Sequence, residues 1–175
     1  MSESSDTSLL ELLDLSQLNC LNEDSARTLR SICSSKSLNT SDSFLLSDAD
    51  EQLLLSIPFN QTVRVRSIAI RSTSPEQAPK TIKLLVNRQS IGFEDVQDAE
   101  EPDVAQKLEL TADQTREGRR IGLRFVRFQS VNSLHIFVES NQGGSDITRI
   151  DSIDVVGQPV ESTKDLSGLK KQEDD

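Results

Sequence analysis

The only histidine of the chain, His135, is the side chain best suited to acid–base chemistry. It lies in SLHIFV, where alternating apolar residues predict a β-strand with Ser133 and Phe137 on the same face as the imidazole. A general base needs a nucleophile and an orienting acid within hydrogen-bond reach. Ser133 supplies a hydroxyl, but the segment lacks the sharp nucleophile turn and the oxyanion donors of hydrolases. We therefore predict that His135 is a surface or interface side chain without a catalytic role.

Arginines are the second group of chemically interesting residues. They are concentrated in two segments of the chain: Arg64, Arg66, Arg71, Arg116, Arg119, Arg120, Arg124 and Arg127. Adjacent strands would merge them into a cationic patch suited to an acidic partner surface. We select Arg64, Arg66, Arg124, Arg127 and His135 as candidate partner-binding residues. The alternative is that these guanidinium groups pair with the chain's own 29 carboxylates or keep a sheet edge soluble.

An acidic run offers many oxygen atoms to a hard cation. It reads FEDVQDAEEPD, from Phe93 to Asp103, and contains six carboxylates. A calcium loop needs about six to eight converging oxygens and a turn-forming residue at a defined place, and this run has no such register. We predict a solvated loop and keep calcium binding as the alternative, which calorimetric titration would test.

The two cysteines, Cys20 and Cys33, match neither a CxxC redox pair nor a zinc half-site. Neither lies beside a cluster of cationic residues in the sequence, so structural thiols are favoured over redox sensors. A metal site would have to rely on these two sulfurs or on scattered carboxylates. We predict neither a metal nor a cofactor.

Length and charge bound the remaining possibilities. The 175 residues suit one domain with a sizeable core, and no repeat or long linker divides them. The net charge of −10 disfavours nucleic acid and anionic membrane surfaces, which attract basic proteins. No apolar stretch of membrane-spanning length and no signal peptide are visible. We expect a monomer in the cytosol or in both cytosol and nucleus.

The elements that carry these residues are predicted to be strands. A buried strand is expected in EQLLLSIPF, with Pro58 at a strand edge or end, a turn at Asn60 and Gln61, and a new strand from Val63. TIKLLV predicts another, Thr81–Val86. The sequence then predicts a short strand around Leu108 and Leu110 and a helical turn capped by Thr111 or Asp113. Consecutive strands are expected from Ile121 to Val160. The fold class is all-β, a jelly-roll β-sandwich.

The two ends of the chain read differently from its centre. Residues 8–21 predict a short amphipathic helix or turn laid on the body, and residues 22–43 an irregular connection. The sandwich core is expected at about residues 44–160. Residues 161–175 predict a mobile tail, either a docking peptide or a solubilising end.

Several segments together resemble the PITH domain, which is named for a proteasome-interacting thioredoxin. They are LLDLSQLNCLNE, SDADEQLLLSIPFNQTV, APKTIKLLVN, FED, LRFVRFQSVNSLHIFVESNQGG and TRIDSIDVVGQPV. The resemblance implies one domain over residues 1–172 with a jelly roll similar to galactose-binding domains. It also implies association with the regulatory particle of the 26S proteasome in cytosol and nucleus.

One departure from the family limits what the resemblance implies. Thioredoxin-like members carry a Trp-Cys-x-x-Cys redox domain before the sandwich, whereas this chain has no Trp and no CxxC, so oxidoreductase activity is not transferred. Both a stand-alone protein and an excised domain fit the sequence. We predict a non-enzymatic interaction module. The alternative is a small-ligand or carbohydrate-binding jelly roll, although sugar sites commonly stack a ring on Trp or Tyr, and both are absent.

Overall fold

The computed structural model describes residues 6–160, so the predicted mobile tail, residues 161–175, lies outside the described residues. The described chain forms the strands β1 (Thr7–Ser8), β2 (Asn19–Leu21), β3 (Leu45–Leu46), β4 (Leu53–Arg71), β5 (Thr81–Val86), β6 (Gln106–Glu109), β7 (Ile121–Gly122), β8 (Val131–Val138), β9 (Arg149–Ile150) and β10 (Ser152–Pro159). Its short helices are η2 (Leu10–Leu12), η3 (Leu15–Gln17), α1 (Leu29–Cys33), α2 (Phe93–Val96), α3 (Ala112–Glu117) and η4 (Phe125–Phe128). None of these helices combines the length and apolar character needed to cross a bilayer. The all-β prediction is confirmed.

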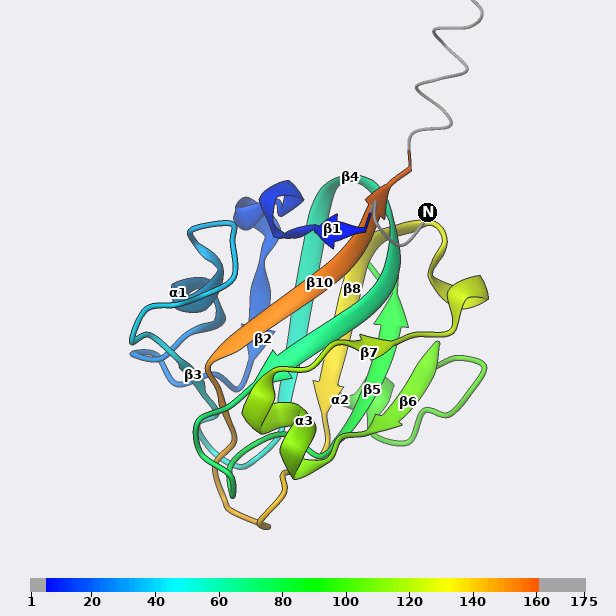
Figure 1. Ribbon diagram of the computed structural model, residues 1–175. Coiled ribbons are helices and arrows are strands. Elements are labelled where there is room, and N and C mark those ends of the chain that lie inside the picture. Colours follow the sequence, from blue (N-terminus) through cyan, green and yellow to red (C-terminus); the bar gives the residue numbers. More distant parts are fainter. Residues whose placement is uncertain (1–5, 161–175) are drawn as a thin grey trace, which may run out of the picture.

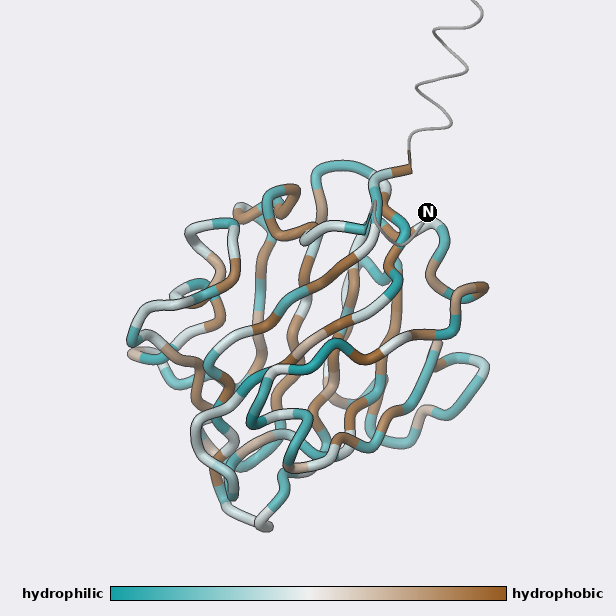
Figure 2. Tube along the Cα trace, viewed as in Figure 1, coloured by the Kyte–Doolittle hydropathy of each residue, from teal (hydrophilic) through white to brown (hydrophobic). Residues whose placement is uncertain are grey.

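Two layers of antiparallel strands make up the sandwich. The main sheet has the order β1-β10-β4-β8-β5-β6, with β2 and β7 also paired to β4, while β3 and β9 form a separate pair. In Figure 1, β10, β7 and the second half of β4 lie in front of β2, β8, β5, β6 and the first half of β4. Apolar residues line the strands and polar residues the loops, as Figure 2 shows.

Strand β4 joins the two layers and corrects one prediction. Its first part pairs with β8 and β2, its second part with β10 and β7, and the register with β8 shifts between Pro58 and Val63. The chain therefore bends where the sequence predicts a turn, but the strand does not end at Pro58. Proline lacks only the N–H donor. The carbonyl of Pro58 still accepts from the backbone N–H of Asp14 at 3.0 Å, and Phe59 bridges to Leu13.

The core between the layers is built from the inward faces of the strands and from the N-terminal segment. Leu9, Leu10 and Leu13 are each 1% exposed, because the turns η2 and η3 lay them against β4 and β10. The predicted amphipathic helix of residues 8–21 is thus two 3-10 turns followed by β2. This segment covers the core near the bend of β4.

A second apolar cluster lies on the outer face of the β4–β8–β5 sheet. It comprises Leu54, Leu85 and Phe137 from the strands and Val96 and Val104 from the segment that crosses them. The predicted solvated loop is therefore wrong for its apolar residues, although all six of its carboxylate residues are exposed. Strand β8 is buried on both faces as a result, and the expected contrast between a core face and an open face is absent there.

A buried lysine fixes the segment that covers this cluster. Lys83 is 2% exposed, and its Nζ donates to the carbonyl oxygens of Val96 at 2.9 Å and Gln97 at 3.0 Å, at the C-terminal end of α2. Carbonyl groups at a helix C-terminus lack intrahelical partners and favour a cation. The ammonium group thus anchors α2 on the sheet.

Candidate functional site

His135 lies under the covering segment and not at the surface, which corrects its predicted position. The side chain is 3% exposed. Its Nδ1 lies 2.9 Å from Oγ of Ser56, and its Nε2 lies 3.0 Å from Oγ of Ser133 and 3.2 Å from the backbone N of Arg88. The physical reason is tertiary: residues 87–105 return across β8 and close the face on which the imidazole projects.

These contacts define the protonation state of the imidazole. A backbone N–H can only donate, so Nε2 accepts from Arg88 and the proton resides on Nδ1, which donates to Ser56. Burial lowers the pKa of His135 from 6.5 to about 4. Ser133 and Nε2 have nucleophile–base spacing, but Nδ1 meets a hydroxyl where a triad has a carboxylate, and a base of such low pKa withdraws a proton weakly. The arrangement orients two serine hydroxyls.

A cavity of about 600 Å³ opens beside these hydroxyls. Polar side chains from η3, β2, β4, β8 and the 88–90 segment line most of it: Gln17, Asn19, Ser56, Arg88, Gln89, Ser90, Ser133 and His135. Such a surface can hydrogen-bond a small polar molecule. Among the described residues that line the cavity there is no Phe, and the chain has no Trp or Tyr.

The structure gathers three of the four candidate arginines around η4. Arg124 Nη1 lies 2.6 Å from Oε1 of Glu101. Arg127 Nη2 donates to the carbonyl oxygen of Pro102 at 2.8 Å. Arg66 lies with its guanidinium carbon 5.0 Å from the centre of the Phe125 ring.

Arg66 and Arg64 differ in their surroundings, although both are on β4. The Nε of Arg66 is 3.8 Å from a carboxylate oxygen of Asp6. The side chain of Arg64 has no hydrogen bond or ion pair within residues 6–160, so no such contact ties it to the group around η4. Two of the candidate arginines thus contact the chain's own carboxylates, as the alternative interpretation expects. Their part in partner binding stays a prediction.

Two exposed apolar residues were missed by the sequence reasoning. Phe125 is 46% exposed and Val126 is 74% exposed, whereas Phe128 is fully buried. Residues 121–160 were expected to form consecutive strands, but residues 125–128 form the 3-10 helix η4, which turns one apolar residue inward and two outward. The signal was the adjacent apolar pair in RFVRF, which breaks strict alternation.

We define the η4 surface as Phe125, Val126, Arg66, Arg124 and Arg127. Interface centres are enriched in aromatic residues and arginine, and this surface combines the two. Its scaffold is ordered: the backbone N–H of Leu123 donates to the carbonyl of Arg66 at 2.9 Å, and buried Phe128 anchors the helix.

Both cysteine thiols are buried, which disfavours the thiolate form that reacts as a nucleophile. Cys20 and Cys33 are both free and buried. Burial raises the pKa of Cys33 to about 12, and burial, with a smaller contribution from Glu23, raises the pKa of Cys20 well above its ordinary value. In the described part of the chain, no group of three or more His, Cys, Asp or Glu side chains is arranged to hold a metal ion.

Solved structures define the class of this fold. The family 32 CBM from C. perfringens NanJ, in complex with galactose, superimposes with a TM-score of 0.59 at 11% identity, covering 86% of this chain and 98% of that one. The SusE-like protein BT2857 has a TM-score of 0.59 at 11% identity, covering 89% and 68%. The chain is a galactose-binding-like jelly-roll β-sandwich.

Sequence comparison identifies the family. The PITH domain model matches residues 1–175. "Thioredoxin-like protein 1" of Schizosaccharomyces pombe is 42% identical over 156 residues, which are 87% of this chain and 52% of that protein. "PITH domain-containing protein 1" of Homo sapiens is 33% identical over 150 residues, 85% of this chain and 68% of that protein. The chain belongs to the PITH domain family, and it spans about half the length of the S. pombe relative.

Proposed function

We propose that this chain is a non-enzymatic protein-interaction module that associates with the regulatory particle of the 26S proteasome, in cytosol and nucleus, as a monomer. Membership of the PITH family supports an interaction role, and the proteasome as partner is what the family resemblance implies. The lack of enzymatic activity is supported by His135, whose neutral imidazole is a weak base without a carboxylate partner.

The η4 surface is the observation that carries this proposal. Phe125 and Val126 expose apolar area at an ordered site, and burial of such area drives association. Of the surrounding arginines, Arg127 contacts a backbone carbonyl, whereas Arg66 and Arg124 each contact a carboxylate of the chain. An acidic partner face with an apolar recess would pair with Arg127 and compete for the other two.

Affinity purification from cell lysate tests the proposal. The full chain serves as bait, and mass spectrometry quantifies regulatory-particle subunits. We expect Val126→Asp to reduce their recovery at least about tenfold, because it places a charge at the centre of a dry contact. The double variant Arg124→Glu, Arg127→Glu should reduce recovery as well. Ala26→Asp is the matched control, because Ala26 is also an exposed apolar residue but lies outside the η4 surface.

Unchanged recovery with both η4 variants would exclude this surface. Absence of all regulatory-particle subunits from the wild-type purification would refute the proteasome as partner. Circular dichroism of each variant verifies that the sandwich is retained.

The cavity beside His135 favours one second candidate, recognition of a small polar ligand such as a sugar. Its polar lining and the galactose bound to the structurally similar C. perfringens domain support it. The absence of Trp and Tyr from the chain weighs against it, because sugar rings stack on those side chains. Glycan arrays probed with wild type and Ser133→Ala distinguish the two: binding that the substitution abolishes supports the ligand site, and an array without signal rejects it.

A further inference from the structure

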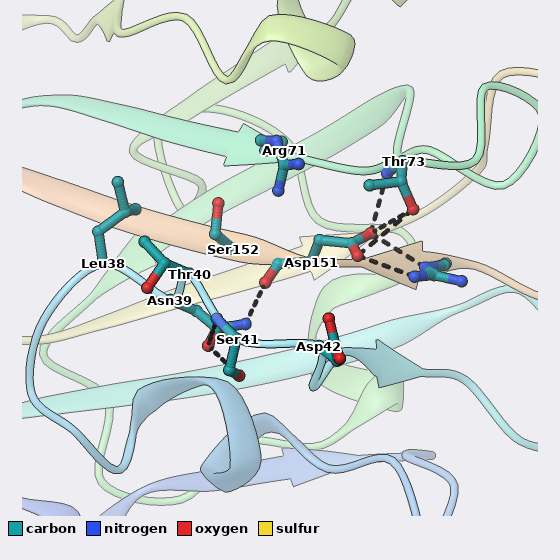
Figure 3. Close-up of a pocket in the computed structure, with 10 residues that line it drawn as sticks. Leu38, Asn39, Thr40, Ser41, Asp42, Arg71, Thr73, Asp151 and Ser152 are labelled. Carbon is teal, nitrogen blue, oxygen red and sulfur yellow. Dashed lines mark hydrogen bonds and ion pairs between the residues drawn. The ribbon is translucent and has the colours of Figure 1, made fainter.

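A second pocket, of about 590 Å³, opens where β4 ends and β10 begins. Figure 3 shows Arg71 and Ser152 on the side of these strands and Thr40 and Asp42 on the side of the 38–42 segment. It is separate from the η4 surface, which meets β4 at Arg66, five residues before Arg71.

Arg71 presents a free guanidinium to this pocket. It is the register partner of Ser152 in the β4–β10 pair, so the two side chains project from the same face. Its aliphatic stem lies against the end of α3, where Gly118 has a φ of 66° and a Cβ would come within 3.2 Å of the Arg71 Cβ. The stem is thus confined, while the guanidinium has neither a hydrogen bond nor an ion pair with any described residue.

Two hydroxyl groups beside Arg71 are also unused. The side chains of Thr40 and Ser152 make no hydrogen bond within residues 6–160, and Ser152 is only 4% exposed. The opposite wall is held in place by Asn39, whose Nδ2 donates to the carbonyls of Asp151 and Ser43, each at 2.9 Å. The guanidinium of Arg71 and the hydroxyls of Thr40 and Ser152 are therefore three donors around the pocket without an acceptor among the described residues.

The other arginine of the pocket is occupied. Arg149 donates to both carboxylate oxygens of Asp151, at 3.0 and 2.9 Å, and stacks on Phe44 with its guanidinium carbon 3.6 Å from the ring centre. Burial would raise the pKa of Asp151, but hydrogen bonds from Arg149 and Thr73 outweigh it and hold that pKa below its ordinary value. The charges of Arg149 and Asp151 therefore compensate each other, and Arg71 is the cation available to a ligand.

The balance of charge selects the kind of anion. The lining contains two arginines, Arg71 and Arg149, and two aspartates, Asp42 and Asp151. Because Arg149 and Asp151 neutralise each other, a dianion such as phosphate would meet one free guanidinium and the carboxylate of Asp42. A carboxylate ligand carries one charge and matches the guanidinium fork with two parallel hydrogen bonds. Leu38, 47% exposed, supplies an apolar wall.

We propose that this pocket binds an aliphatic monocarboxylate: the carboxylate accepts from Arg71, Ser152 and Thr40, and the aliphatic part lies on Leu38. A peptide C-terminus ending in leucine and a small aliphatic acid share this chemistry. Binding requires neither a metal nor a covalent step.

Backbone amide NMR titration of the ¹⁵N-labelled chain tests the proposal. The probes are acetyl-Ala-Ala-Leu with a free carboxyl group, the same peptide as its C-terminal amide, 4-methylpentanoate, and inorganic phosphate. We expect saturable shifts at Thr40, Thr73 and Ser152 with the free-acid peptide. The amide should bind at least about tenfold more weakly, because it cannot form the charged pair. Comparison of the peptide with 4-methylpentanoate assigns the source, since tighter binding of either identifies the better ligand.

Arg71→Gln should lower the affinity for the free acid at least about tenfold, and Ser152→Ala should lower it to a smaller extent. Lys107→Gln is the matched control, because it removes one positive charge on β6, which does not line the pocket, and should leave the affinity unchanged. Equal binding of acid and amide, equal binding to wild type and Arg71→Gln, or tighter binding of phosphate than of either acid would overturn the proposal. Unchanged amide spectra of the ligand-free variants verify their fold.

Discussion

The stability of the fold should depend on pH through His135. Burial lowers the pKa of this imidazole from 6.5 to about 4 in the folded chain, whereas an unfolded chain restores an ordinary value of about 6.5. As the pH falls, the unfolded state therefore binds the proton first. The stabilisation by neutral His135 is complete above about pH 6.5 and is lost progressively between about pH 6.5 and about pH 4.

The two pKa values set the size of this effect. For a single group, linkage gives a loss of about 2 kcal/mol in the free energy of unfolding between about pH 7.5 and about pH 5. Carboxylates such as Asp151, whose pKa is held low in the fold, add their own acid sensitivity. The histidine contribution must therefore be measured as a difference between two proteins that share those carboxylates.

Urea unfolding of the wild type and of His135→Gln provides that difference. The variant retains a side chain that can hydrogen-bond but cannot titrate. We expect the wild type to be the more stable at about pH 7.5 and its advantage to shrink by about 2 kcal/mol at about pH 5. A constant difference over this range would refute the assigned burial and protonation of His135.

An independent measurement uses the fact that the chain has one histidine. The proton NMR signal of its Cε1–H group should not titrate between about pH 8 and about pH 5.5, because the folded imidazole stays neutral there. An inflection near about pH 6.5 in the folded protein would contradict the structure.

Three further predictions concern other parts of the fold. Gly157→Ala should destabilise the protein by about 2 kcal/mol or more, since a Cβ there would overlap the carbonyl oxygen of Arg64; Gly122→Ala, which meets no atom within 4 Å, should change the midpoint of thermal unfolding little. The buried thiols, including Cys33 with its pKa of about 12, should react with a disulfide reagent only after unfolding, and rapid native-state labelling would contradict their burial. Lys83→Met should remove the two hydrogen bonds to α2 and speed amide exchange at residues 93–97, and unchanged exchange there would show that the lysine does not hold this helix.

Local signals in the sequence were sufficient for several elements. TIKLLV predicts a strand over Thr81–Val86, and β5 has those bounds. A helical turn capped by Thr111 or Asp113 was predicted, and α3 has Thr111 as its N-cap, because the Thr111 hydroxyl accepts from the N–H of Gln114 in a capping box. Such signals involve residues close in sequence, so they need no knowledge of the rest of the chain.

The predictions that were wrong concern residues whose surroundings depend on contacts between segments distant in sequence. The strand pattern around His135 was read correctly, but the burial of its second face depends on residues 87–105, which lie far away in sequence. Pro58 was expected at a strand edge or end, yet the partner strand continues opposite it at Ser133. The alternation rule describes one sheet face meeting solvent and cannot reveal a segment that folds over that face.

The amino-acid sequence by itself determined the all-β class, the family resemblance and the absence of a CxxC redox pair, because these depend on residue types and on short-range patterns. Only the tertiary structure decided which side chains are available to a partner. It turns Phe125 and Val126 outward on η4, leaves Arg71 unpaired among the described residues, and withdraws His135 from solvent. The physical reason is that the exposure and pairing of a side chain depend on which segments pack against it. Those segments are remote in sequence and are brought together when the two layers of the sandwich pack on each other.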